Sequence, residues 1–167
     1  MNLYLLRHGL AVELGTAGLT RDSERPLTPK GRRKLRKIAA GMKALELEFD
    51  VIFSSPYVRA RQTAEIVAEA LHARKKVELT ATLTPGGGHS KLIELINQSR
   101  RLEDVLLVGH EPHLSECISL LVSGKSGFSV TMKKGGLCKL AAESLGFGRC
   151  ASLEWLLTPG QLALMGC

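Results

Sequence analysis

Three uninterrupted apolar runs divide the chain, at residues 3–6, 51–53 and 105–108. Runs of this length without polar residues are typical of strands buried on both faces of a parallel sheet. Each run is followed by a turn and then by apolar residues at helical spacing, so strands alternate with helices. This alternation predicts an α/β fold.

Prolines mark where three helices are expected to begin. Thr28 before Pro29 is a typical N-cap and first-turn pair, and Pro56 and Pro112 are expected at the first positions of two further helices. The first helix is predicted to pack through Leu35, Ile38, Met42 and Leu45. The second, which runs to about residue 71, is predicted to pack through Val58, Ile66, Val67 and Leu71. The third is predicted to pack through Leu114, Cys117, Ile118 and Leu121.

The remaining pattern adds shorter elements. Residues 77–79 are predicted to form a strand and residues 90–98 a modest helix, while residues 130–132, 137–141 and 151–157 are strand-like. Because residues 146–148 contain two glycines between the last two segments, a hairpin is expected to extend the sheet. We therefore predict a single domain over residues 1–167, a three-layer α/β/α sandwich with a mostly parallel sheet and one antiparallel strand.

Composition narrows the class of protein. A chain of 167 residues with 44% hydrophobic and 23% charged residues is long enough for one well-packed domain. Its apolar runs are far shorter than the roughly 20 residues that span a bilayer, and Arg7 interrupts the first of them. A cytoplasmic protein without membrane association is expected. The four cysteines are widely spaced, so disulfides and structural zinc are not expected.

The net charge of +7 favours an acidic partner or substrate. Seven of the basic residues fall within residues 30–43, which indicates a solvated helix face, and aromatic residues make up only 4% of the chain. Nucleic-acid binding is therefore not expected. A monomer is expected because no long apolar surface stripe demands a partner.

Reactive side chains follow the three buried strands. Arg7, His8 and Gly9 come directly after the first strand, Arg59 follows the second, and His110 follows the third. Arginine matches phosphate oxygens, neutral histidine can act as a nucleophile, and glycine permits a sharp turn or close approach to a ligand. Because carboxyl ends of parallel strands meet at one sheet edge, these groups are predicted to surround a phosphoryl group.

Arg7-His8-Gly9, residues 55–64 (SPYVRARQTA) and Gly109-His110 together resemble the three motifs of the histidine phosphatase (phosphoglycerate mutase-like) superfamily. The short length and residues 25–31 (RPLTPKG) are most similar to its SixA-type phosphohistidine phosphatase branch. The resemblance implies that His8 is the nucleophile and forms a phosphohistidine intermediate. It also implies that Arg7, Arg59 and His110 hold the phosphoryl oxygens, with no metal or organic cofactor.

The sequence does not decide which residue, if any, acts as the general acid. Mutase-like relatives carry a carboxylic acid in an insertion between the second arginine and the second histidine, and no carboxylate-rich insertion is present here. Glu111, directly after His110, is either a general acid or an acidic residue at a helix start. A phosphohistidine substrate needs an acid less, because a protonated ring leaves as neutral imidazole. An uncovered site could also admit a side chain of another protein.

Three other functions remain. A phosphatase for a small phosphorylated metabolite would need recognition residues that the sequence does not identify. A phosphate-binding regulatory module without turnover is disfavoured because all four core residues are present. A metal hydrolase built on His8, His110 and Glu111 lacks a further close ligand, and His72, His89 and His113 are expected to be surface or local structural residues.

Overall fold

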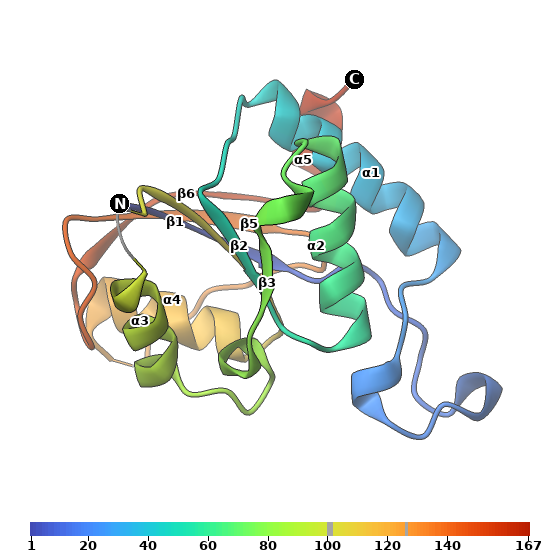
Figure 1. Ribbon diagram of the computed structural model, residues 1–167, viewed down its shortest axis with the longest axis horizontal. Coiled ribbons are helices and arrows are strands. Elements are labelled where there is room, and N and C mark those ends of the chain that lie inside the picture. The colour runs from blue at the N-terminus through green and yellow to red at the C-terminus, as the bar shows by residue number, and fades with distance from the viewer. Residues whose placement is uncertain (100–101, 126) are drawn as a thin grey trace.

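A six-stranded sheet with helices on both faces forms the body of the structure (Figure 1), a computed structural model that describes residues 1–99, 102–125 and 127–167. The strands are β1 (Asn2–Arg7), β2 (Val51–Ser54), β3 (Val77–Leu79), β4 (Asp104–Gly109), β5 (Leu137–Ala142) and β6 (Ala151–Leu157). The helices are α1 (Pro29–Ala44), α2 (Val58–Ala70), α3 (His89–Gln98), α4 (His113–Ser123) and α5 (Pro159–Met165). Four short 3-10 turns lie between them: η1 (Thr16–Gly18), η2 (Asp22–Glu24), η3 (Arg74–Lys76) and η4 (Ala81–Leu83).

The strand order is β3-β2-β4-β1-β5-β6. Strand β4 pairs in parallel with both β1 and β2, and β2 pairs in parallel with β3. Strand β5 pairs antiparallel with β1 and with β6, so within the described sheet it is the one strand that runs against the others. The predicted mostly parallel α/β sheet with a C-terminal hairpin is confirmed.

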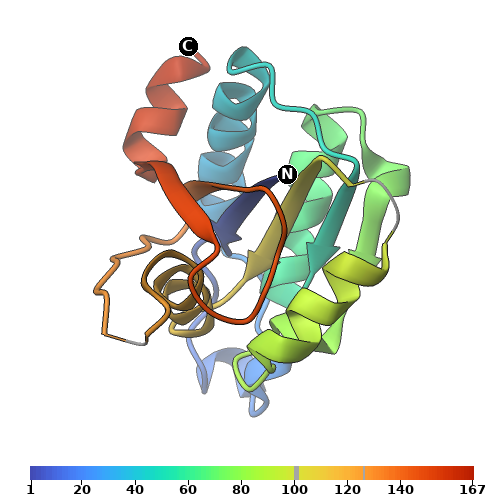
Figure 2. The same cartoon turned by 90° about the vertical axis from the view of Figure 1, so that its left-hand side faces the viewer.

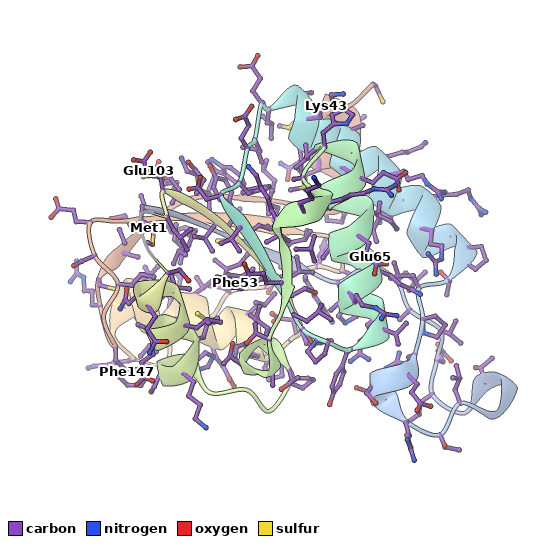
Figure 3. All side chains as sticks on the ribbon, viewed as in Figure 1. Met1, Lys43, Phe53, Glu65, Glu103 and Phe147 are labelled. Carbon is purple, nitrogen blue, oxygen red and sulfur yellow. The ribbon has the colours of Figure 1, made fainter. Side chains whose placement is uncertain are left out.

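Helices α1, α2 and α5 cover one face of the sheet, and α3 and α4 cover the other (Figures 1 and 2). Successive strand residues alternate between two cores. Tyr4 and Leu6 belong to the core under α1, α2 and α5, whereas Leu3 and Leu5 belong to the core under α3 and α4. Figure 3 shows Phe53 of β2 in the interior, and it lies in the second of these cores. Because both faces of the sheet are buried, its central strands consist of uninterrupted apolar residues.

Helix α1 begins as predicted. The Thr28 hydroxyl accepts a hydrogen bond of 2.9 Å from the Gly31 N–H, and Pro29 occupies the first turn. Leu35, Ile38 and Met42 are buried. The prediction for Leu45 is wrong, because the helix has ended there and its side chain is 36% exposed.

The starts of two other helices also differ from prediction. Helix α2 begins at Val58 rather than at Pro56, and α4 begins at His113, with Pro112 at its N-cap position. Helix α2 packs mainly through small side chains rather than through Val58, Ile66 and Leu71, which are only partly buried. Its buried residues are Arg59, Ala60, Thr63, Ala64, Val67 and Ala68.

Residues 130–132 do not form the expected strand. Met132 is buried in the core under α3 and α4, but its carbonyl accepts a hydrogen bond from the Arg7 side chain instead of from a neighbouring strand. The strand at residues 77–79 and the helix at residues 90–98 are present, the latter as α3 with Leu92, Ile93 and Ile96 buried. Within the described residues, no helix combines the length and the apolar character needed to cross a membrane.

Helix α5 was not predicted, although a threonine followed by a proline starts it, as at the start of α1. Thr158 precedes Pro159, and its hydroxyl accepts from the Gln161 N–H while the Gln161 side chain accepts from the Thr158 N–H. This capping box starts a helix that packs on α1. The contact is close because a side chain at Gly41 of α1 would collide with the carbonyl of Leu162.

Replacing Gly41 with alanine is predicted to destabilise the protein by about 1–3 kcal/mol, because overpacking forces α5 away from α1. Without this collision, the same change inside a helix would stabilise by up to about 1 kcal/mol, so the sign of the effect is diagnostic. Gly160→Ala is the matched control, since a Cβ there meets nothing closer than the Thr158 hydroxyl at 4.0 Å. Urea unfolding of both variants measures the difference; a Gly41→Ala variant as stable as the parent would contradict the packing described here.

Candidate functional site

The site lies at the carboxyl ends of β1, β2 and β4, where backbone pairing with β4 continues one residue beyond β1 and beyond β2. The His8 N–H donates to the Gly109 carbonyl, and the Ser55 N–H donates to the Val108 carbonyl, both at 3.0 Å. These bonds fix the chain segments that carry Arg7, His8, Ser55 and His110 at one sheet edge. Helix α2 then begins beside them and presents Arg59 in its first turn.

Two hydrogen bonds fix the protonation of His8. Its Nδ1 lies 2.7 Å from the Gly9 carbonyl, and because a carbonyl only accepts, Nδ1 carries the proton. The Nε2 atom therefore has a free electron pair, which accepts a bond of 3.1 Å from the Nε–H of Arg59. The ring is held in the tautomer whose Nε2 can act as a nucleophile.

Arg59 is 4% exposed and is held from three directions. Besides the bond to His8, its Nη1 donates to the Asp22 carbonyl at 2.6 Å and its Nη2 donates to the Asp22 carboxylate at 2.8 Å. Asp22 belongs to the turn η2, which is tied to Arg25 by a second ion pair of 2.8 Å. The polar loop before α1 therefore positions the guanidinium against the histidine.

His110 lies directly opposite His8, with ring centroids 5.0 Å apart. Its Nε2 is 2.8 Å from the hydroxyl of Ser55, and its Nδ1 is buried without a partner among the described residues. Tyr57 closes one side, with its ring 5.1 Å from that of His110 and 5.3 Å from the Arg59 guanidinium carbon. An unsatisfied nitrogen of His110 thus remains available for an anionic ligand.

Arg7 is fixed by the segment that precedes β5. Its Nη1 donates to the Met132 carbonyl at 2.7 Å, while its backbone pairs with Gly135 and Gly136 at 3.0 and 3.1 Å. Its Nε is buried and has no partner within the described ranges. A buried N–H without a partner is costly, and a bound anion would remove that cost.

Burial and neighbouring charge keep both histidines neutral. Burial, reinforced by Arg59, Arg7 and Lys134, lowers the pKa of His8 to about 3. Burial, reinforced by His8 and Arg59, lowers the pKa of His110 to about 3. Two neutral imidazoles beside two guanidiniums create a positive pocket in which the Nε2 of His8 is unprotonated, and such a pocket suits a phosphoryl group.

Among the described residues, Asp22 is the only carboxylate that forms an ion pair with either of the two site arginines, and its partner is Arg59. Partial burial acts to raise its pKa, but hydrogen bonds from Arg25 and Arg59 outweigh burial and lower it. Asp22 is therefore held ionised and suits the positioning of Arg59 better than proton donation.

Gly9 has a packing role that the sequence did not specify. Its N–H donates to the Thr63 hydroxyl at 3.1 Å, and that hydroxyl in turn donates to the Arg59 carbonyl at 2.7 Å. A Cβ at Gly9 would lie 2.5 Å from a methyl group of Leu35. The Gly9 N–H is thus occupied by Thr63 in this structure, and a contact of Gly9 with phosphate stays a prediction.

Glu111 is half-buried at the start of α4, where its carboxylate accepts from the Ser115 N–H at 3.1 Å. Burial lowers the pKa of Arg7, and the charge of Glu111 partly opposes that shift. Glu111 thus has the expected contact with a helix start and also lies near a phosphate-binding candidate. Its role as a general acid stays a prediction.

Of the other histidines, His72 is exposed just after α2, while His89 and His113 are the first residues of α3 and α4. His113 is buried rather than on the surface, and its ring stacks on His89 with centroids 4.3 Å apart. Burial, reinforced by His89, lowers the pKa of His113 to about 4. In the part of the chain that the structure describes, no three histidine, cysteine or acidic side chains are grouped closely enough to hold a metal ion.

The sequence interpretation missed three supporting residues. Thr63 had a readable signal, because it lies one helical turn after Arg59. Ser55 was given no role at the site beyond being the first residue of the motif at residues 55–64, but its hydroxyl contacts His110. Asp22 gave no local signal, since its contact with Arg59 joins a loop to a helix 37 residues later.

Stability is predicted to fall as the pH is lowered from about 6.5 to 5. His8, His110 and His113 have folded pKa values below the ordinary value of 6.5, so the unfolded chain binds protons first and acid favours unfolding. Each histidine contributes a slope of up to about 1.4 kcal/mol per pH unit in this range. Urea unfolding at several pH values tests this, and His113→Leu is expected to reduce the slope. An unchanged stability over this range would contradict burial of neutral histidines.

The chain is similar in sequence and fold to known proteins. Residues 3–84 match the sequence profile of the Histidine phosphatase superfamily (branch 1). The chain is 34% identical over 142 residues to an uncharacterised protein of Picosynechococcus sp., covering 84% of each chain. It is 28% identical over 168 residues to the phosphohistidine phosphatase SixA of Escherichia coli K12, covering 98% of each.

The structure of the protein histidine phosphatase SixA complexed with tungstate superimposes on it with a TM-score of 0.80 and 26% identity. That match covers 97% of this chain and 99% of the other. As its motifs predicted, the chain belongs to the histidine phosphatase superfamily and resembles SixA along nearly its whole length.

Proposed function

We propose that this protein is a phosphatase that removes the phosphoryl group from phosphohistidine in another protein, through a phosphohistidine intermediate on His8. The observation that carries the proposal is the free Nε2 electron pair of His8, held beside Arg59 and His110 and next to Arg7. Similarity to SixA over 98% of both chains supports the choice of substrate.

In the first step, the Nε2 of His8 attacks phosphorus. The new N–P bond forms as the bond from phosphorus to the substrate imidazole breaks, and that ring leaves neutral if its other nitrogen was already protonated. Before attack, the Arg59 N–H must release Nε2 and donate its hydrogen bond to a phosphoryl oxygen instead, while the guanidinium keeps its proton. The same guanidinium then stabilises charge on the transferring group, together with Arg7 and His110.

In the second step, water attacks the phosphorus of the intermediate. The N–P bond breaks, its electron pair returns to Nε2, and inorganic phosphate leaves with the protons of the water. Neutral His8 is regenerated in the same tautomer, since the Gly9 carbonyl still accepts from Nδ1. No metal is needed for either step, because cationic side chains and N–H groups stabilise the charge.

Access to the site favours a substrate presented on a protein surface. Between Arg59 and His110 the chain forms the rest of α2, the edge strand β3, helix α3 and strand β4, which are parts of the α/β/α body. No described segment in this interval forms a separate subdomain over the carboxyl ends of the strands (Figure 2).

We also expect the protein to act as a monomer in the cytoplasm, without nucleic acid or membrane.

Glu111 is the proposed acid for substrates that need one. An alcohol leaving group must be protonated, whereas a protonated imidazole leaves without help. Glu111→Gln is therefore expected to slow the hydrolysis of alkyl phosphates about tenfold or more while leaving phosphohistidine hydrolysis within about twofold. An equal loss of hydrolysis rate on both substrates would indicate that Glu111 only stabilises the start of α4.

Replacing Arg59 with alanine is predicted to lower kcat/KM at least about a hundredfold, because it removes the group that binds His8 and stabilises the phosphoryl charge. Arg61→Ala is the matched control, since Arg61 lies two residues later on α2 and is exposed. Its activity is expected to stay within about twofold. Steady-state phosphate release measures both, and equal effects of the two changes would exclude Arg59 from the reaction.

The substrate assignment is tested by phosphate release from a phosphohistidine-bearing peptide and from a panel of phosphate esters. We expect phosphohistidine to be hydrolysed at least about tenfold faster at equal concentration, and His8→Ala to abolish release from every substrate. Hydrolysis of esters alone would favour a small-molecule phosphomonoesterase of the same superfamily. Tight phosphopeptide binding without release would favour a regulatory module.

A further inference from the structure

A basic groove adjoins the site and shares Arg7 and Gly9, the residues on either side of His8, with it. It has a volume of about 460 Å³ and lies between the first turns of α1, the turn before β5 and the start of α5. The four lysines of the groove, Lys30, Lys34, Lys133 and Lys134, are exposed around it.

The turn that carries Lys133 and Lys134 is hydrogen-bonded to Arg7 of the site. Backbone bonds join Arg7 to Gly135 and Gly136, and the Arg7 side chain binds the carbonyl of Met132, the residue just before Lys133. Gly135 has a φ of +80°, and a side chain there would approach Ile38 of α1 to 2.7 Å. The position of the two lysines beside the phosphate site is therefore fixed by the backbone.

The charge of the groove is not neutralised locally. Its lining contains no aspartate or glutamate, and within the described ranges none of the four lysines makes an ion pair. Lys30 lies in the first turn of α1, which contains no acidic residue. Because the positive end of the helix dipole disfavours a cation there, helix stability does not account for this lysine.

We propose that this groove binds acidic side chains that flank the phosphohistidine of the protein substrate, an inference that rests on the proposed function. Four ammonium groups on flexible stems, spread along the rim, match carboxylates spread over a protein surface. Because Arg7 lines the groove and also belongs to the proposed phosphate site, residues that flank the phosphorylated side chain would lie close to the groove. The shared chemistry also admits a second phosphate of a small molecule, which the test distinguishes.

The experiment uses two phosphohistidine peptides that are identical except for four flanking positions, glutamate in one and glutamine in the other. The parent protein is expected to hydrolyse the glutamate peptide with about tenfold higher kcat/KM at low ionic strength, and added salt should reduce this preference. A variant with Lys30, Lys34, Lys133 and Lys134 changed to glutamine is expected to lose the preference.

The control variant loses the same number of positive charges, all four from α1, through Arg33→Gln, Arg36→Gln, Lys37→Gln and Lys43→Gln. All four residues are exposed and none lines the groove, and Figure 3 shows Lys43 at the opposite end of α1. This variant is expected to keep the preference, which separates the groove from the effect of net charge. No preference in the parent, or equal loss in the control, would overturn the proposal while leaving the proposed function intact.

Binding is measured independently of turnover, by fluorescence anisotropy of a labelled, unphosphorylated glutamate peptide. The groove variant is expected to bind it about tenfold more weakly than the parent. Peptide binding through the lysines, with neither phosphopeptide hydrolysed, would support an acid-binding groove and overturn the proposed function. If the groove variant instead weakens inhibition by inorganic pyrophosphate but keeps the peptide preference, the groove serves a second phosphate and the proposal is wrong.

Discussion

Parallel pairing of β4 with both β1 and β2 is the constraint on which the site depends. Because β4 lies between the two earlier strands, one backbone ladder positions segments that are about fifty residues apart in the chain. The bonds of His8 and Ser55 to β4 extend this ladder into the site. The precision of the catalytic geometry thus derives from the sheet, and a displacement of β4 by one residue would separate His8 from His110.

The electrostatics follow from this placement. Burial disfavours a charge on either imidazole, and the two guanidiniums act in the same direction for His8. The arginines remain charged, as guanidinium groups do in proteins. The result is a site that is cationic as a whole but keeps His8 neutral, and this combination suits attack on an anionic phosphoryl group.

Much of this could be predicted from the sequence because the signals are local. Unbroken apolar runs identified β1, β2 and β4, and the polar residues after them identified Arg7, His8, Arg59 and His110. The prediction of a strand at residues 130–132 was wrong because the local apolar pattern competed with a tertiary contact. There the carbonyl of Met132 accepts a hydrogen bond from the Arg7 side chain. Asp22 could not be predicted, because its contact with Arg59 depends on how the loop before α1 folds.

The central claim is that the phosphoryl group passes through His8, and the most direct measurement is isolation of the phosphorylated enzyme. The protein would be mixed with excess phosphohistidine peptide, quenched in alkali within milliseconds and mapped by mass spectrometry. The mechanism predicts a phosphoryl group on His8 that is stable in alkali, is lost in acid, and is absent from His8→Ala. Phosphate release without any phosphorylated enzyme, or with the group on another residue, would contradict it.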